Sequence, residues 1–293
     1  MAKTVITTFA LLVCILGASV AAQNPMTGTW TASISSKDDS KLQLNLERRN
    51  DKGKRHQSGQ GFEFSDLQGL SREQAQNGGP VSFSLVREAG RVDLEGSFQN
   101  GKGSGTFRFT PNAAFVSAMR SRGFDFQPDS DGDFEDRLLT AATLNITTAL
   151  ADDLVSAFGK LDIHDLFKAA IFKIDSQFAR EMKASGFNNL GMEELVKARI
   201  FKIDAKLVRE VAQMGFANEP FESLVKMQIF KVTPEFIAEL RSEGLNDLKV
   251  EDIVKLRIFK IDVDYIRKAK AEGEPTDVES LVQRKIGVAR RVR

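Results

Sequence analysis

The chain has very few of the residues that form cross-links. Its 293 residues include one cysteine, Cys14, which excludes an intramolecular disulfide. An exported chain without disulfides has to obtain its stability from packing. Proline is also scarce, with seven residues, and tryptophan and tyrosine occur once each.

Histidines and catalytic motifs are equally scarce. The only two histidines, His56 and His164, fall in different predicted domains, and neither belongs to a His-Glu-x-x-His zinc motif. The sequence contains no Gly-x-Ser-x-Gly elbow and no phosphate-binding glycine loop that follows a strand. We therefore predict no enzymatic activity, no catalytic residues, no metal site and no cofactor.

No excess of charge of one sign is present either. The chain has 41 basic and 40 acidic residues, whereas nucleic-acid-binding proteins usually show a clear basic excess. This balance predicts no nucleic-acid partner. The C-terminal tail, Arg284–Arg293, is locally basic. A solvated end of the fold is the simpler interpretation of the tail, and contact with an acidic partner or anionic lipid headgroups is the alternative.

The longest apolar run lies at the N-terminus. Lys3 precedes the run from Val5 to Leu16, and small residues ending in Val20-Ala21-Ala22 follow it. This pattern predicts a secretory signal over residues 1–22 and an exported protein, periplasmic or secreted. The alternative is an uncleaved anchor, although the run is short for a membrane span of about 20 residues.

Residues 23–109 are predicted to form a small antiparallel β domain. Apolar side chains alternate with polar ones in five runs between Met26 and Phe109, which is typical of strands with one buried face. Glu88-Ala89-Gly90 and Asn100-Gly101 fit hairpin turns. Ser71 and Gln74 fit a capping box at the start of a short helix. The domain is expected to be a meander or half-barrel.

Trp30 is the candidate ligand-binding residue of this domain. Gly28-Thr29-Trp30 resembles the Gly-x-Trp opening of lipocalins and avidins, although the domain is shorter than those barrels. A small-ligand site around Trp30 is the alternative function. The simpler interpretation is that Trp30 closes one end of a small core.

A 29-residue repeat dominates residues 110–293. It starts at Ile171, Ile200 and Ile229, and a shorter copy starts at Ile258. Helix-capping residue types recur with an apolar residue three positions later, and a glycine stands eleven positions after most of them. The pattern predicts about six α-helical hairpins that stack into a solenoid. The predicted caps are Asn112, Thr147, Asp175, Asp204, Thr233 and Asp262.

The first hairpin carries an acidic insertion, residues 125–136. In a calcium loop with Gly132 at its sixth position, Gln127 would replace the first ligand and Leu138 the last. Because both closing ligands are absent, a solvated acidic loop is favoured over a calcium site.

Stacked repeats place equivalent residues in rows on the surface. Two rows are basic: Lys173, Lys202, Lys231 and Lys260 at the inter-repeat turn, and Lys168, Lys197, Lys226 and Lys255 on the second helix. We expect the second row to be neutralised within each helix by Glu193, Glu222 and Glu251, which precede their lysines by four residues. The first row is the candidate contact for an acidic segment of a partner. The alternative is that these lysines only keep the surface soluble. A row of phenylalanines is expected in the core: Phe172, Phe201, Phe230 and Phe259.

The repeats resemble those of uncharacterised exported bacterial proteins. The copies TPEFIAELRSEGLNDLKVEDIVKLRIF (Thr233–Phe259) and DSQFAREMKASGFNNLGMEELVKARIF (Asp175–Phe201) carry the resemblance, and the strands of Pro80–Asn112 resemble the segment that precedes such repeats. Similar repeats form C-terminal extensions of membrane metalloproteases of the beta-lactam-sensing antirepressor type. This chain has no zinc motif and no spanning helices, so the resemblance implies architecture and export but no protease activity. Where those repeats often have His-Gly after the isoleucine, this chain has Phe-Lys.

The sequence thus predicts an α+β protein in which a β domain precedes a helical solenoid. The favoured function is non-enzymatic interaction with a protein partner in the cell envelope. Membrane contact is expected only through the basic tail.

Overall fold

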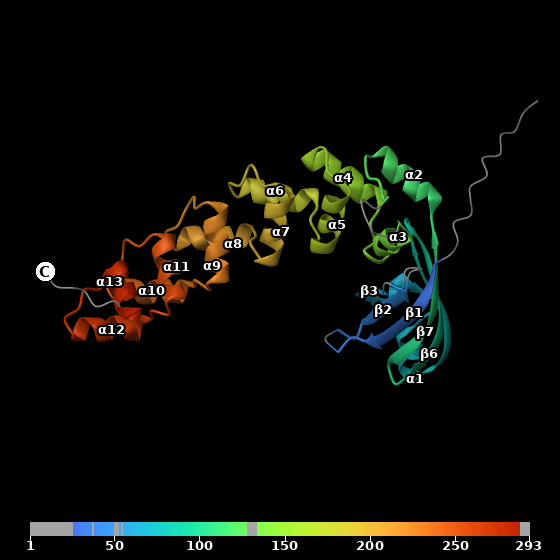
Figure 1. The fold of residues 1–293 in the computed structure, drawn as a ribbon, viewed down its shortest axis with the longest axis horizontal. Coiled ribbons are helices and arrows are strands. Elements are labelled where there is room, and N and C mark those ends of the chain that lie inside the picture. Colours follow the sequence, from blue (N-terminus) through green and yellow to red (C-terminus); the bar gives the residue numbers. More distant parts are fainter. Residues whose placement is uncertain (1–25, 37, 50–52, 54, 128–133, 288–293) are drawn as a thin grey trace, which may run out of the picture. The chain divides into compact units, whose positions relative to one another are not determined.

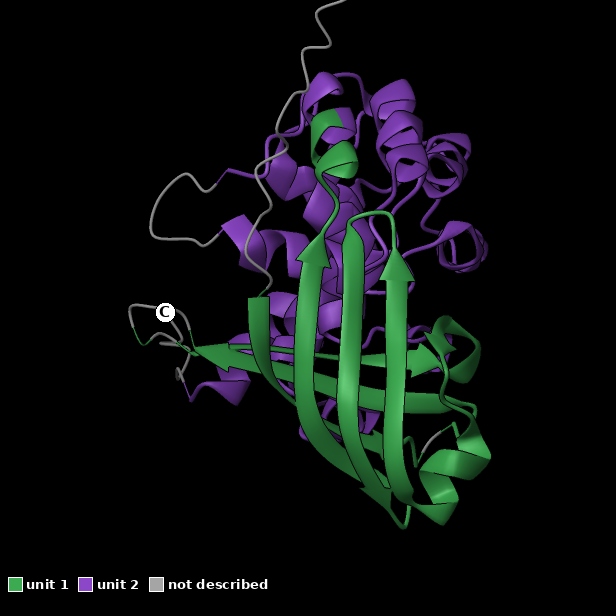
Figure 2. Ribbon diagram, turned by 90° about the vertical axis from the view of Figure 1, so that its right-hand side faces the viewer, with its two compact units in different colours: residues 1–117 green, residues 118–293 purple. Residues whose placement is uncertain are grey.

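The computed structural model describes residues 26–36, 38–49, 53, 55–127 and 134–287 (Figure 1). The predicted secretory signal lies outside these residues. The chain divides into two compact units, residues 1–117 and 118–293, and the division falls within one helix (Figure 2). The fold is α+β, with an antiparallel half-barrel followed by helical hairpins, which confirms the predicted fold class.

Unit 1 contains one seven-stranded antiparallel sheet with the order β3-β2-β1-β7-β6-β5-β4. Strands that follow one another in the chain pair with each other, except β3 and β4, and β1 also pairs with β7, which joins the two ends of the meander in one half-barrel sheet. Strands β3 and β4 are its two edges. The strands are β1 (Met26–Ile34), β2 (Lys41–Arg49), β3 (Arg55–Glu63), β4 (Leu67–Gln68), β5 (Gly79–Arg87), β6 (Gly90–Gln99) and β7 (Lys102–Pro111).

The local features predicted for unit 1 are present. Asn100 and Gly101 both have positive φ, of 50° and 75°, in the turn between β6 and β7, as a tight hairpin requires. Helix α1 (Arg72–Asn77) begins at a capping box: the Ser71 hydroxyl accepts from the amide of Gln74, whose side chain accepts from the Ser71 amide. The apolar side chains of five strands face one core, and Trp30, Leu42, Leu85, Leu94 and Phe109 are fully buried in it.

After the sheet, the described residues form six helical hairpins. In each, a first helix (even number) is followed by a second helix (odd number), and α2 crosses the division between the units. The helices are α2 (Ala113–Ser121), α3 (Phe134–Thr143), α4 (Thr148–Phe158), α5 (Ile163–Phe172), α6 (Ser176–Ala184), α7 (Met192–Ile200), α8 (Ala205–Gln213), α9 (Phe221–Ile229), α10 (Pro234–Ser242), α11 (Val250–Ile258), α12 (Val263–Ala271) and α13 (Val278–Lys285).

The capping pattern explains where the first helices start and stop. All six predicted caps accept a hydrogen bond from a backbone amide of the first turn, at 2.8–3.3 Å in the five for which the bonded amide lies three residues on. Asn112 accepts from the amide of Ala114, two residues on. Glycines in the left-handed conformation follow the first helices, for example Gly215 with φ 97° and Gly244 with φ 84°.

First and second helices of successive hairpins both contribute to the core of unit 2. In the C-terminal part of unit 2, Met227, Val232, Leu240, Ile253 and Leu256 belong to one buried cluster. The partly buried Phe230 and Phe259 pack against it, so that row contributes to the core as expected. Ile258, the last residue of α11, is 49% exposed.

Among the described residues, no single helix is long and apolar enough to cross a bilayer. Helices α3 and α4 pass that test only as a pair, and they are bent by 90° at their junction.

Candidate interaction surface

The first lysine row adopts a backbone conformation that L-residues rarely take. Lys173, Lys202, Lys231 and Lys260 have φ values of 54°, 55°, 52° and 52°. Each lies in the turn between the second helix of one hairpin and the capping residue of the next. The left-handed region costs a residue with a Cβ about 1–2 kcal/mol, whereas glycine takes it readily.

The following repeat holds two of these turns, those of Lys173 and Lys231, through the backbone. Arg199 donates to the carbonyl oxygen of Lys173 at 2.7 Å, and Arg257 donates to that of Lys231 at 2.5 Å. The guanidinium of Arg199 also lies 3.7 Å from the ring centroid of Phe178, and that of Arg257 lies 4.1 Å from that of Phe236. The main chain of the turn is thereby fixed by a neighbouring hairpin.

The side chains of the row lysines form no polar contacts with the described residues. All four residues are exposed, and within the described part of the chain none of their ammonium groups forms an ion pair or a side-chain hydrogen bond. The nearby aspartates that could neutralise them, such as Asp175 and Asp204, accept helix-capping hydrogen bonds instead. The described structure therefore presents a row of unpaired cations at equivalent turns, two of which are held by the next hairpin.

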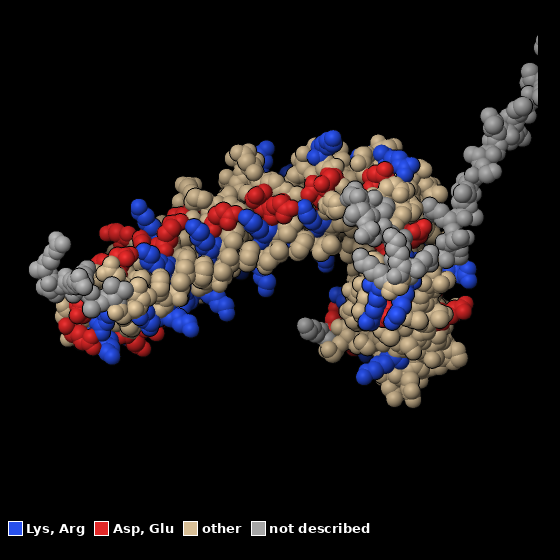
Figure 3. Space-filling view, in the orientation of Figure 1, with Lys and Arg blue, Asp and Glu red and all other residues tan. Residues whose placement is uncertain are grey.

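The second lysine row is neutralised, but the predicted partners were wrong. Each lysine pairs with a glutamate of the next hairpin rather than with the one four residues before it. The distances are 2.7 Å for Lys197–Glu222, 3.6 Å for Lys226–Glu251 and 2.9 Å for Lys255–Glu279, and Lys168 pairs with Glu193 in the same way. The stacking brings the start of one second helix beside the middle of the previous one, which puts the inter-repeat glutamate within reach. Figure 3 shows a band of alternating acidic and basic side chains on this unit.

These pairs predict how stability depends on pH. The hydrogen bond from Lys255 lowers the pKa of Glu279 below its ordinary 4.5, and Lys270 together with Arg267 lowers that of Glu243. Glu222 raises the pKa of Lys197 above 10.5. A carboxylate with a lowered pKa stabilises the folded state above its unfolded value, and that contribution is lost as the pH falls through the folded value. The lysine contribution is lost as the pH rises through its raised value.

We therefore expect the urea midpoint of unfolding to decrease below about pH 4.5 and again above about pH 10.5. The Lys255→Met variant should lose less of its stability on acidification than the wild type, because Glu279 then has no cation beside it. An acid-side loss of the same size in both proteins would contradict this assignment. Exposed pairs of this kind contribute little individually, so the comparison requires matched samples.

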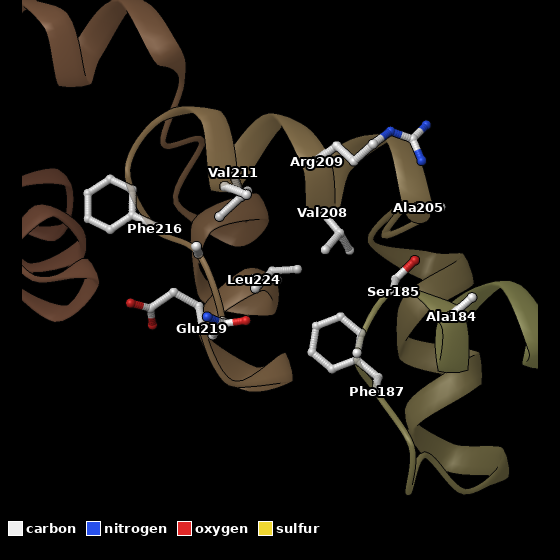
Figure 4. A pocket seen from close by; sticks show the side chains of 14 residues that line it. Ala184, Ser185, Phe187, Ala205, Val208, Arg209, Val211, Phe216, Glu219 and Leu224 are labelled. Carbon is white, nitrogen blue, oxygen red and sulfur yellow. The ribbon is translucent and has the colours of Figure 1, made fainter.

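Two equivalent grooves lie between successive first helices. A groove of about 440 Å³ lies between α6 and α8, where Phe187, Val208 and Leu224 point toward one another (Figure 4). Its counterpart of about 370 Å³ lies one repeat earlier, between α4 and α6, and is lined by Ala179 and Leu195 at the matching positions. Arg209 and Glu219 are the charged residues that line the first groove. The grooves recur with the repeat and contain no histidine or cysteine.

Trp30 lies inside the half-barrel. It is 1% exposed, and its indole Nε1 donates to the carbonyl oxygen of Glu95 at 3.1 Å. Its ring contacts Phe83 edge-on at 5.5 Å and Phe98 at 5.6 Å between centroids. The side chain is thus a central element of the core, and a ligand could reach it only by displacing these rings.

The histidines, the acidic insertion and the basic tail do not come together in one site among the described residues. His56 is on β3 and His164 is on α5, in different units. In the acidic insertion, residues 128–133 lie outside the described residues, and Leu138, the position of the missing calcium ligand, is fully buried. Over the described ranges no group of three His, Cys, Asp or Glu side chains could hold a metal ion. In the tail, Arg284 pairs with Glu272, and residues 288–293 lie outside the described residues.

A row of exposed isoleucines was not predicted from the sequence. Ile171, Ile200, Ile229 and Ile258 are 54%, 52%, 47% and 49% exposed, each two residues before a lysine of the first row. The recurring Ile-Phe-Lys was visible in the sequence, but an apolar residue at the end of a helix is ordinarily assigned to the core.

The lysine and isoleucine rows are the features of this surface that packing within the chain does not explain. No family model matches the chain, and comparison with curated proteins and with solved structures also gave no match.

Proposed function

We propose that this protein is a non-enzymatic interaction module that binds a protein partner in the cell envelope through the helical repeats of unit 2. The contact centres on the first lysine row, Lys173, Lys202, Lys231 and Lys260. The observation that carries the proposal is that four unpaired cations occupy backbone positions at which glycine would be more stable.

This observation favours binding over the simpler solubility interpretation. Lysines that only keep a surface soluble can occupy any exposed position, including helix faces where their backbone is unstrained. Here lysine recurs at the strained position of four successive turns, and the four turns present ammonium groups at one equivalent position. A regular row of cations at equivalent turns suits a partner segment with regularly spaced carboxylates.

The proposal is tested by crosslinked capture from envelope extract with the full chain as bait. Three baits are compared: the wild type, the variant with all four row lysines changed to Glu, and a control with Lys183, Lys206, Arg209 and Lys268 changed to Glu. The control alters charge equally at exposed residues outside the row. We expect one protein to be retained by the wild type and the control and lost from the row variant. Equal retention by all three baits, or by none, would refute the lysine row as the contact.

A further inference from the structure

The exposed isoleucines and the row lysines recur together, two residues apart, in four successive repeats. We define the isoleucine–lysine ridge as Ile171, Ile200, Ile229 and Ile258 together with Lys173, Lys202, Lys231 and Lys260. Of the seven large apolar residues that stand out as exposed among the described residues, four are these isoleucines, and a fifth, Ile286, ends the next second helix. Exposed apolar side chains that recur at one position indicate a contact surface rather than chance exposure.

The isoleucines of the ridge follow one another along the stacked second helices at a regular spacing. Each isoleucine lies at the C-terminal end of a second helix, and inter-repeat ion pairs place successive second helices side by side. Packed helices lie about 8–10 Å apart, so adjacent isoleucines are separated by roughly that distance. Two turns of an α-helix advance about 10.5 Å. A helix that lies along the ridge would therefore present one residue to each isoleucine at every seventh position.

The charged side chains near the isoleucines indicate which residues of a bound helix would flank its apolar contacts. An unpaired lysine follows each isoleucine by two residues, and a lysine neutralised by the next hairpin precedes it by three, one helical turn back. Isolated basic side chains along the edge of unit 2, next to the band of mixed charge, are visible in Figure 3. Carboxylates of a partner that lie beside the isoleucines would therefore be attracted by the unpaired lysines.

We propose that the isoleucine–lysine ridge binds an acidic amphipathic helix of a protein partner, with apolar residues at every seventh position and Asp or Glu beside them. This inference rests on the proposed function and specifies the partner segment. A bilayer is a poorer fit because it requires a broad apolar face, whereas the ridge is one residue wide and the glutamates of the ion pairs lie on the same helices. A second copy of this chain is a poorer fit because it would bring its own lysines to the same surface.

The test uses a synthetic helical peptide of about 28 residues, or four heptads, with Leu at every seventh position and Glu on one flank. A scrambled peptide of the same composition is the control. Binding of the labelled peptide to the full chain is followed by fluorescence anisotropy. We expect saturable binding that weakens at least about tenfold when Ile171, Ile200, Ile229 and Ile258 are changed to Ser, and about tenfold again when the four lysines are changed to Gly.

Matched variants separate the ridge from general hydrophobicity. Val155 and Val86 are 37% and 39% exposed outside the ridge, and Val155→Ser with Val86→Ser should leave peptide affinity unchanged. Because the isoleucines are half exposed, their variant should retain the helical circular dichroism of the wild type, which shows that lost binding is not lost folding.

Four outcomes would overturn the inference: equal binding of the scrambled peptide, no binding of either peptide, ridge-dependent binding of phosphatidylglycerol vesicles in place of the peptide, or a dimer in light scattering that the isoleucine variant abolishes. The inference can also fail alone. If the captured envelope protein is lost with the lysine variant but retained by the isoleucine variant, the proposed function stands and the helical docking mode does not.

Discussion

Replacing Trp30 by alanine is expected to lower the free energy of unfolding of unit 1 by about 3–5 kcal/mol. The indole is almost completely buried between Phe83 and Phe98, so its removal leaves a large cavity in a small half-barrel. It also leaves the carbonyl oxygen of Glu95 without its donor.

The sheet cannot collapse easily into that cavity. Trp30 stands opposite Gly105 in the pairing of β1 with β7, and Gly105 stands opposite Gly96 in the pairing of β7 with β6. A Cβ at Gly105 would lie 1.9 Å from the Glu95 oxygen, and one at Gly96 would lie 2.7 Å from the indole. Backbone and ring already touch, so the strands have little room to rearrange.

The measurement is urea unfolding followed by far-ultraviolet circular dichroism, since the variant has no tryptophan to report. Trp30→Phe is the matched control and should cost only roughly 1–2 kcal/mol, because it keeps the ring contacts and loses the hydrogen bond. The helical transition of unit 2 should not move. A Trp30→Ala variant as stable as Trp30→Phe would show that the indole is loosely packed. That result would favour the alternative in which a small ligand binds around Trp30.

Replacing all four row lysines by glycine is expected to stabilise unit 2 by roughly 2–4 kcal/mol while it removes the proposed contact. Each substitution relieves a left-handed L-residue and should contribute about 0.5–1 kcal/mol after the greater freedom of glycine in the unfolded chain is subtracted. The four sites lie in different turns, so their effects should add.

The control for this result is Lys268→Gly. Lys268 lies in the last turns of α12, where the backbone is right-handed helical and glycine should cost about 1 kcal/mol. Urea unfolding monitored by helical circular dichroism distinguishes the two effects by sign. Destabilisation in both variants would mean that the row lysines support the fold, and their strained backbone would then not indicate a binding role.

The sequence predicted the regular parts of both units because the local chemistry acts alone there. Thr233, Asp175 and the other capping residues need only an amide three residues away, and the hairpin at Asn100-Gly101 needs only its own two positive φ angles. Strand β3 was missed for the opposite reason. Its sequence, RHQSGQGFE, has no apolar alternation, because it is an edge strand with little of its surface in the core.

The candidate surface was predicted in part. The positions of the lysines followed from the repeat, but the glutamate partners of the second row did not. Glu193 is four residues from Lys197 in the sequence, yet it lies beside Lys168 of the preceding hairpin once the hairpins stack. Which of two possible partners a side chain contacts is decided by the packing of neighbouring helices. The exposure of Ile258 and the left-handed backbone conformation of the row lysines have the same cause. Both depend on where one hairpin ends against the next.

The contacts between successive hairpins also influence how the number of repeats in such a chain can change during evolution. The joint between the second helices repeats the same Lys–Glu ion pair from α5 to α13, and two of the turns repeat the same arginine-to-carbonyl hydrogen bond. Loss or duplication of one 29-residue segment would therefore rejoin surfaces that already complement each other. A gene for such a protein can gain or lose a whole hairpin without new interface mutations, and each such event lengthens or shortens the binding surface by one isoleucine and one lysine.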